Sequence, residues 1–185
     1  LLPNNYVPST GRNFGTRYSE PETSEVVEIG FKAKGDWGTF NFAAFDQTIE
    51  NFQSTIFQGT GFVLANAGTQ STKGIEWDST FKLMDPLHIT FAGVLQDPVY
   101  DSFPTAPGPA GTVIDLSGQR PAGINELALS TSATYTHDFS DAISGFVRAD
   151  YQYESDVQFV DNIAGLTRST NIINASAGVG FDSGV

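Results

Sequence analysis

The chain has no cysteine and only one methionine among its 185 residues. The absence of cysteine excludes disulfide frameworks, zinc ribbons and thiol catalysis. No run of about 18 apolar residues occurs, so no membrane-spanning helix is expected, although that test does not detect membrane strands, whose signal is alternation. The first residues show neither the basic nor the apolar region of a signal peptide.

Basic residues are scarce. Lysine and arginine number 9 against 21 acidic residues, and the formal net charge is −12. Binding to phosphates requires a basic face, so we expect no nucleic-acid partner. The acidic residues are scattered along the chain and do not form an acidic tail.

Catalytic motifs are also missing. Leu116–Gln119 (LSGQ) is similar to part of the signature of ABC-type ATPases, but the chain has no G-x-x-x-x-G-K-[ST] phosphate loop. It has no G-x-S-x-G elbow, and its only histidines, His88 and His137, lack the spacing of metal ligands. Glu76 and Asp78 share one strand face, where a hydrated wall is a simpler explanation than a glycosidase pair. We therefore expect no enzyme, no cofactor and no metal.

The residues that are abundant favour strands. The chain has 15 Phe, 6 Tyr and 2 Trp, punctuated by 19 Gly and 9 Pro. Seven segments alternate apolar and polar residues with a period of two, and only Phe45 clearly breaks the pattern. One face of each is apolar, and the other carries Gly, Ser, Thr, Asn and charges of both signs. The segments are 26–34, 39–45, 74–83, 87–96, 126–136, 146–155 and 171–181.

The connections between these segments alternate strictly in length. Short ones lie near 35–38, 84–86 and 137–142, and long ones at roughly 51–71, 97–124 and 155–169. Up-and-down outer-membrane barrels show this asymmetry, whereas Greek-key crossovers would disturb it. The apolar face then has two interpretations: a packed inner face of a soluble sandwich, or a lipid-facing band. Aromatic residues near the strand ends, such as Trp37 and Phe139, favour lipid.

An ordered set of segments resembles the TonB-dependent outer-membrane receptors. EPETSEVVEIGFKAK (20–34) is similar to a Pro-Glu…Glu-x-Gly-x-Lys strand start of that family. FNFAAFDQTIENFQ (40–53) and LANAGTQSTKGIEWDSTF (64–81) resemble the pieces that follow it. The loop beginning YDSFPTAPG and ending IDLSGQRPAGINELALS, and then FVRADYQYESDV (146–157), continue the series in the family's order. The resemblance covers most of 20–181, and it makes 115–123 the exit of a long loop into a strand that begins near Glu126.

The resemblance implies an all-β, antiparallel, up-and-down transmembrane β-barrel, of which these seven strands form a part. We expect residues 1–185 to be an internal fragment of the barrel domain, without the plug domain. The implied function is active, TonB-dependent uptake of a scarce solute, either a ferric siderophore, cobalamin or a glycan, across the outer membrane of a Gram-negative cell. The implied partners are outer-membrane lipid, the receptor's own plug domain, TonB acting through the plug, and a small-molecule or glycan ligand. Two alternatives stay open: a secreted soluble β-sandwich that binds carbohydrate, and a fragment of a passive porin.

Candidate residues follow from the two faces and the loops. Charges on the polar face are expected to line the lumen, where Arg148 and Asp150 would form cross-strand pairs with neighbouring charges. Aromatic residues in the long loops are candidates for ligand contact. The lumen candidates are Glu28, Lys32, Glu76, Asp78, Lys82, Arg148, Asp150 and Glu154, and the loop candidates are Phe52, Phe57, Tyr100, Phe103 and Phe159.

Overall fold

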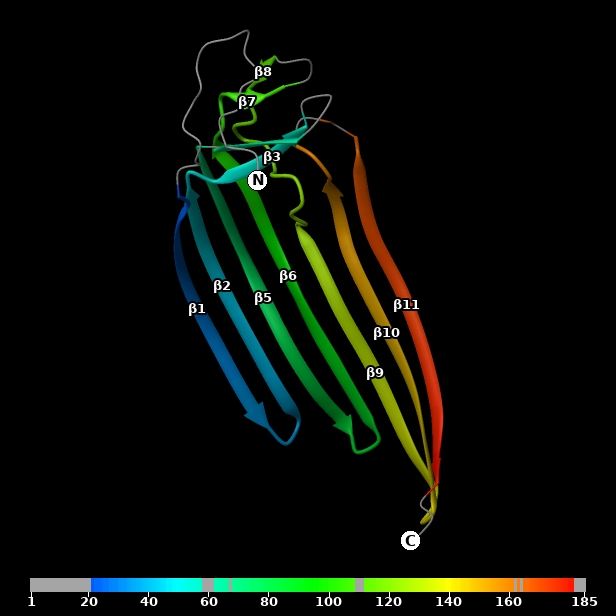
Figure 1. The fold of residues 1–185 in the computed structure, drawn as a ribbon. Helices are drawn as coiled ribbons and strands as arrows, with labels where there is room; N and C mark the ends of the chain where they lie inside the picture. The colour runs from blue at the N-terminus through cyan, green and yellow to red at the C-terminus, as the bar shows by residue number, and fades with distance from the viewer. Residues whose placement is uncertain are drawn as a thin grey trace.

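Seven long strands form one antiparallel sheet. The computed structural model describes residues 21–57, 62–66, 68–108, 112–161, 163 and 165–181, and no helix in that part of the chain is long and apolar enough to cross a membrane. The order of the strands in the sheet is their order in the chain, and Figure 1 shows them side by side in a curved sheet that does not close. The strands are β1 (Thr23–Gly35), β2 (Gly38–Glu50), β5 (Thr69–Met84), β6 (Leu87–Ser102), β9 (Leu127–Ser140), β10 (Ile143–Gln158) and β11 (Thr167–Phe181). The predicted up-and-down arrangement of seven strands is confirmed.

All three short connections are two-residue turns, at 36–37, 85–86 and 141–142, and they lie at one end of the sheet (Figure 1). Gly38 shows why the first turn needs glycine. Its φ is +129°, and a Cβ there would lie 1.8 Å from the carbonyl oxygen of Thr80. Such a φ is accessible to glycine and strained for other residues. The long connections gather at the opposite end, so the predicted alternation of loop lengths is confirmed.

The strands run further toward the long loops than predicted. β6 continues to Ser102 and β10 to Gln158, and two short ribbons lie within the long connections. Lys73 on the outer side of β5 forms an ion pair with Asp46 (3.2 Å) and is in register with Asp97. These extensions carry polar residues on both faces, so alternation of hydrophobicity could not reveal them. The ribbons pair β3 (Gln53–Phe57) with β4 (Phe62–Asn66), and β7 (Ala106–Pro107) with β8 (Val113–Ile114).

The register joins the apolar residues into one continuous face. Residues paired directly across strands share a face. Ile75 is paired with Ala44 on one side and Leu95 on the other, and Leu95 is paired in turn with Leu127. Ile29 is 76% exposed, and no second sheet or helix of the described chain covers this face. A soluble sandwich would bury the face against a second layer, so that alternative is wrong for this chain.

Bulky rings on both faces lie across glycines of the next strand. A Cβ at Gly93 would meet the ring of Trp77 at 2.5 Å, and one at Gly74 would meet the ring of Phe45 at 2.7 Å. Such rings cover backbone that a glycine leaves bare. Phe45 therefore breaks the sequence alternation because it fills the space over Gly74 on the polar face.

Candidate functional site

The polar face forms a wall that contains every predicted lumen residue. Its rows are continuous across the sheet: Asp78 is in register with Asn41 on β2 and Ala92 on β6, and Ala92 with Ser130 on β9. The register places the eight candidates together on this face, opposite the apolar one. They are Glu28 and Lys32 on β1, Glu76, Asp78 and Lys82 on β5, and Arg148, Asp150 and Glu154 on β10.

Four of the eight are paired, but not as expected. Arg148 binds Asp150 two residues along its own strand, with Nε 2.9 Å from Oδ1 and 3.1 Å from Oδ2, so the expected cross-strand pairing of these two residues is wrong. An extended strand places i and i+2 on one face, within reach of a long side chain. The cross-strand pair on this part of the wall is Arg168 with Glu154, at 3.7 Å. Lys82 pairs with Asp85 in the adjacent turn at 2.8 Å.

The other four surround one hollow. Glu28, Lys32, Glu76 and Asp78 form no ion pair with any residue that the structure describes. Together they line a depression of about 410 Å³, here called the wall hollow, whose lining also includes Ala43. Asn41 donates a hydrogen bond to Asp78 at 3.3 Å. The wall hollow thus presents three carboxylates and one ammonium group with no charged partner in the described chain.

At the end of the sheet that carries the long connections, residues of these connections pack into a small core. Tyr100, Phe103, Ala106 and Leu116 are buried together, and Phe52 and Ile114 pack against them. The rings of Tyr100 and Phe103 meet edge-on at 5.2 Å. We call these six residues the loop core.

The loop core separates the predicted ligand aromatics into two groups. Tyr100 and Phe103 are each 1% exposed, and Phe52 packs on Tyr100 at 5.9 Å, so these three rings support the loops from within. Phe159 is 52% exposed. The side chain of Phe57 lies outside the described part of the structure.

Asp161 ties the third long connection to the second. Its Oδ2 accepts a hydrogen bond from the Tyr100 hydroxyl at 3.0 Å, and its Oδ1 accepts one from the Ala122 amide at 2.6 Å. Only 8% of Asp161 is exposed. Because a buried carboxylate is costly unless hydrogen bonds satisfy it, these two donors explain how the charge is tolerated there.

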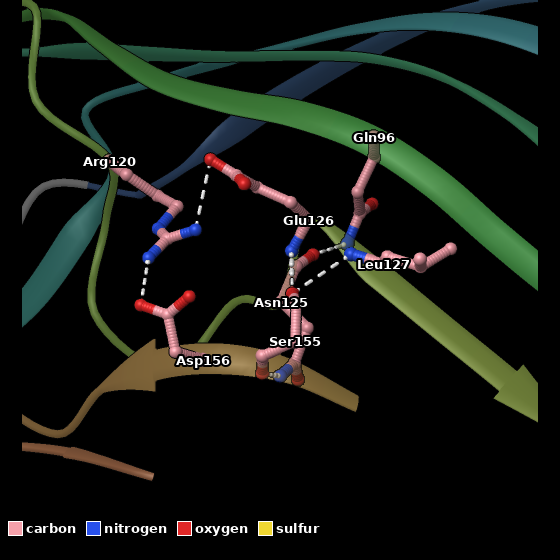
Figure 2. Close-up of polar contacts among 7 residues, drawn as sticks. All are labelled: Gln96, Arg120, Asn125, Glu126, Leu127, Ser155 and Asp156. Atoms are coloured by element: carbon pink, nitrogen blue, oxygen red, sulfur yellow. Dashed lines mark hydrogen bonds and ion pairs between the residues drawn. The ribbon is translucent and has the colours of Figure 1, made fainter. Parts of the chain in front are cut away.

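Residues 115–126 act as a strap between β6 and β10, and Figure 2 shows the contacts made by its second half. Arg120 lies between Glu126 (2.9 Å) and Asp156 (3.1 Å). The Asn125 amide group donates to the Ser155 carbonyl at 2.6 Å, and Gln96 donates to the Asn125 carbonyl at 2.8 Å. The Ser155 hydroxyl accepts from the amides of Glu126 and Leu127, both at 3.1 Å.

The LSGQ stretch is part of this strap and not a nucleotide site. Leu116 is buried in the loop core, and the backbone N–H of Gln119 donates to the Leu116 carbonyl at 3.0 Å, which closes a turn. Gly118 has φ +77°. Hydrogen bonds from Ser117 stabilise the ionised Asp115 and lower the pKa of its carboxyl group. The chain then enters β9 at Leu127, which confirms the predicted loop exit.

One exposed corner joins the wall to the loops. The Arg168 guanidinium lies 5.8 Å from the centre of the Phe159 ring, and Thr170 donates to Glu154 at 2.8 Å beside it. Sequence reasoning missed Arg168 because the register shifts between Glu154 and Val157, which obscures the alternation there. Within the described residues, no group of three or more histidine or acidic side chains is placed to hold a metal ion.

Comparison with known proteins gives a family and a fold. The family model described as "TonB dependent receptor-like, beta-barrel" matches residues 3–184. No curated protein sequence matches the chain.

Among solved structures, the ferric yersiniabactin uptake receptor FyuA of Yersinia pestis superposes with a TM-score of 0.63 at 15% identity, over 86% of this chain and 22% of that one. The siderophore receptor PiuA of Acinetobacter baumannii gives 0.64 at 18%, over 93% and 24%. The ferric-catecholate import receptor Fiu of E. coli K12 gives 0.60 at 17%, over 98% and 25%. The chain therefore spans about a quarter of the length of these structures, and at such identities they show a shared fold.

Proposed function

The chain belongs to the TonB-dependent receptor β-barrel family, and from that premise we propose that it forms the wall and loop-side rim of a receptor that takes up a ferric siderophore. Receptors of this family are transport proteins of the Gram-negative outer membrane. Their barrels of about 22 strands enclose a plugged lumen. Energy for uptake would reach this chain's barrel through TonB acting on its plug.

The uncovered apolar face is the observation that carries the proposal. Ile29 and Ile173 are each 76% exposed, and the polar wall lies directly behind them. Each such side chain, if kept in water, forgoes about 1.5–3 kcal/mol of burial free energy, whereas contact with lipid tails would provide it. A sheet with one apolar face and one polar, charged face can contact lipid on the first and the aqueous lumen on the second. The matching family model is that of receptor barrels, which favours a receptor over the passive-porin alternative.

The wall hollow is the part of the wall best suited to hold the plug. A plug that fills the lumen would remove water from Glu28, Glu76 and Asp78, and desolvated carboxylates require cationic or hydrogen-bonding partners. Lys32 supplies only one positive charge beside these three acids. The proposed partners are therefore arginine or lysine side chains of the plug.

This contact is tested in the complete receptor by urea unfolding of the plug. Glu76→Gln should lower the urea midpoint of the plug, since removing one partner of a buried charge pair is destabilising. Thr80→Ala, on the same face of β5 but outside the wall hollow, is the control. Equal midpoints for the two variants would contradict plug docking at the wall hollow.

Phe159 and Arg168 are the proposed ligand contacts. A siderophore complex that carries negative charge and aromatic rings can use a guanidinium for charge-assisted hydrogen bonds and a ring face for stacking. Both side chains are exposed at the junction of wall and loops. Phe52, Tyr100 and Phe103 would act indirectly by keeping the loops in shape.

The substrate class is tested by binding of ferric siderophores to the complete receptor, with cobalamin and glycans as competing ligands. Arg168→Gln should weaken binding of the ferric siderophore about 10-fold, because a hydrogen bond to a charged group is worth about 1.5 kcal/mol. Lys34→Gln, at the turn end of the wall, should leave the dissociation constant unchanged. Binding of cobalamin or a glycan in place of every ferric siderophore would overturn the substrate class while leaving the receptor role intact.

A further inference from the structure

β10 contains a bulge close to the proposed ligand contacts. Glu154 is paired with Thr170 on β11, and three residues later Val157 is paired with Arg168. Two residues of β10, of which the first is Ser155, therefore lie opposite one residue of β11. Because side chains alternate between the faces with a period of two, one extra residue reverses the face of every residue that follows it.

The bulge decides the face on which Phe159 lies. Counted from Glu154, regular alternation would put Gln158 on the wall and Phe159 on the opposite face. In the structure the Phe159 amide donates to the Leu166 carbonyl at 3.0 Å, and the Phe159 ring lies 5.8 Å from the Arg168 guanidinium. Arg168 also reaches Glu154 on the wall, at 3.7 Å. The two side chains proposed to contact the ligand therefore come together on the wall because of the bulge.

Ser155 anchors the bulge to the strap. Its hydroxyl accepts hydrogen bonds from the amides of Glu126 and Leu127, both at 3.1 Å, and its carbonyl accepts one from the Asn125 side chain at 2.6 Å (Figure 2). Regular pairing of β9 with β10 ends at Ala128, so the hydroxyl replaces ladder acceptors for the residues just before it. A bulge interrupts the ladder between two strands, and these bonds compensate for that loss.

We propose that Ser155 is a positioning residue for ligand binding, because it holds the bulge of β10 and so keeps Phe159 on the wall beside Arg168. Ser155 acts through Phe159 and does not itself contact the ligand. Without the hydroxyl, the regular register would place Asp156 opposite Arg168 and turn Phe159 to the other face. The inference rests on the proposed role of Phe159 and Arg168 as ligand contacts, and it adds the residue on which their meeting depends.

The orientation of residue 159 is tested first, without ligand, in the complete receptor. Phe159→Cys and Arg168→Cys are combined, the two thiols are linked with a short bifunctional reagent, and each single variant gives the background. Adding Ser155→Ala should reduce the linked fraction at least 5-fold, because residue 159 then faces away. Ser155→Thr keeps the hydroxyl acceptor and should link normally. Ser130→Ala, on the wall face of β9, is the matched control and should also link normally.

Removing the extra residue should reverse the effect of Ser155→Ala. Deletion of Asp156 leaves equal numbers of residues on β10 and β11 between the two pairs that flank the bulge. Regular alternation then puts residue 159 on the wall without a bulge. Ser155→Ala combined with this deletion should therefore restore linking, which a general loosening of the loops would not do. Migration on an unheated gel checks the folded fraction of every variant.

Binding is then measured with iron(III) tris-catecholate, a negatively charged aromatic probe. Phe159→Ala should weaken binding about 2- to 10-fold, the usual effect of one aromatic contact. Ser155→Ala should weaken it to a similar extent, and the double variant should lose no more than Phe159→Ala does, because both changes remove the same contact.

Two results would refute the role of Ser155 while leaving the ligand contacts intact. They are unchanged linking in Ser155→Ala, and failure of the Asp156 deletion to restore linking. If Phe159→Ala bound the probe as tightly as the unmodified receptor, or if the unmodified receptor did not bind the probe, the proposed ligand contact itself would be wrong.

Discussion

We expect the loop core to depend strongly on the hydrogen bonds that the Asp161 carboxylate accepts. Asp161→Ala leaves the Tyr100 hydroxyl and the Ala122 amide without this acceptor. A buried donor that loses its acceptor costs about 1–3 kcal/mol. Removing the buried charge returns part of that cost. We therefore expect local opening of the loop core to become about 2–4 kcal/mol easier.

Hydrogen exchange of the Ala122 amide in the complete receptor measures this directly. Every 1.4 kcal/mol is a factor of ten, so exchange at Ala122 should become about 30- to 700-fold faster. Tyr100→Phe, which removes one donor and keeps the charge, should give a smaller increase. In the double variant of Tyr100→Phe with Asp161→Ala, the two effects should fall short of additivity, because both changes remove the same hydrogen bond.

Asp156→Asn is the control for this series. Among the described residues, Asp156 pairs with Arg120 at an exposed position, and such pairs are worth less than about 1 kcal/mol. If Asp161→Ala changed exchange at Ala122 no more than Asp156→Asn does, the stability of the loop core would not depend on Asp161.

Three further predictions concern the sheet and the strap. Gly38→Ala should greatly reduce the fraction of receptor that migrates as folded on an unheated gel, because its Cβ would lie 1.8 Å from the Thr80 carbonyl oxygen; Gly180→Ala, whose Cβ lies 3.2 Å from the Ser144 hydroxyl, should not. Gly93→Ala should destabilise the barrel by about 1–3 kcal/mol in urea unfolding, since its Cβ would meet the Trp77 ring at 2.5 Å; a midpoint unchanged from the unmodified receptor would show that the ring moves aside freely. The Asp115 carboxyl has a lowered pKa in the folded chain, so its contribution to the strap is complete above the ordinary pKa of about 3.9 and is lost as pH falls through the lower folded pKa. Amide exchange at Ser117 should therefore become faster in acid, and Asp115→Asn should abolish this pH dependence.

Alternation of hydrophobicity in the sequence located those parts of the strands that have one apolar and one polar face. It located the first part of β6, from Leu87 to Gln96, where apolar and polar residues alternate. It failed beyond Gln96, since that extension is held by backbone pairing with β5 and has polar residues on both faces. β7 is two residues long and includes Pro107, so it has no periodicity to detect.

The sequence was enough to predict which face of the sheet each candidate residue lies on, but not which side chains it contacts. Parity along each strand is enough to place Glu76 and Asp78 on one face. It cannot show that Arg148 turns along its own strand, because that depends on the rotamer of one long side chain. The burial of Tyr100 and Phe103 depends on Leu116 and Asp161, which come from other parts of the chain, so their loop position alone suggested exposure.

The polar extension of the strands sets the distance between the apolar face and the loop core. The apolar face of β6 ends at Leu95, and the loop core begins five residues later at Tyr100. At about 3.3 Å per residue this is roughly 17 Å along the strand, or about 13 Å of rise at a tilt near 40°. A headgroup layer is only about 5–7 Å thick on each side of the hydrocarbon. We therefore expect the loop core to stand in the aqueous space above the bilayer, clear of the headgroup layer.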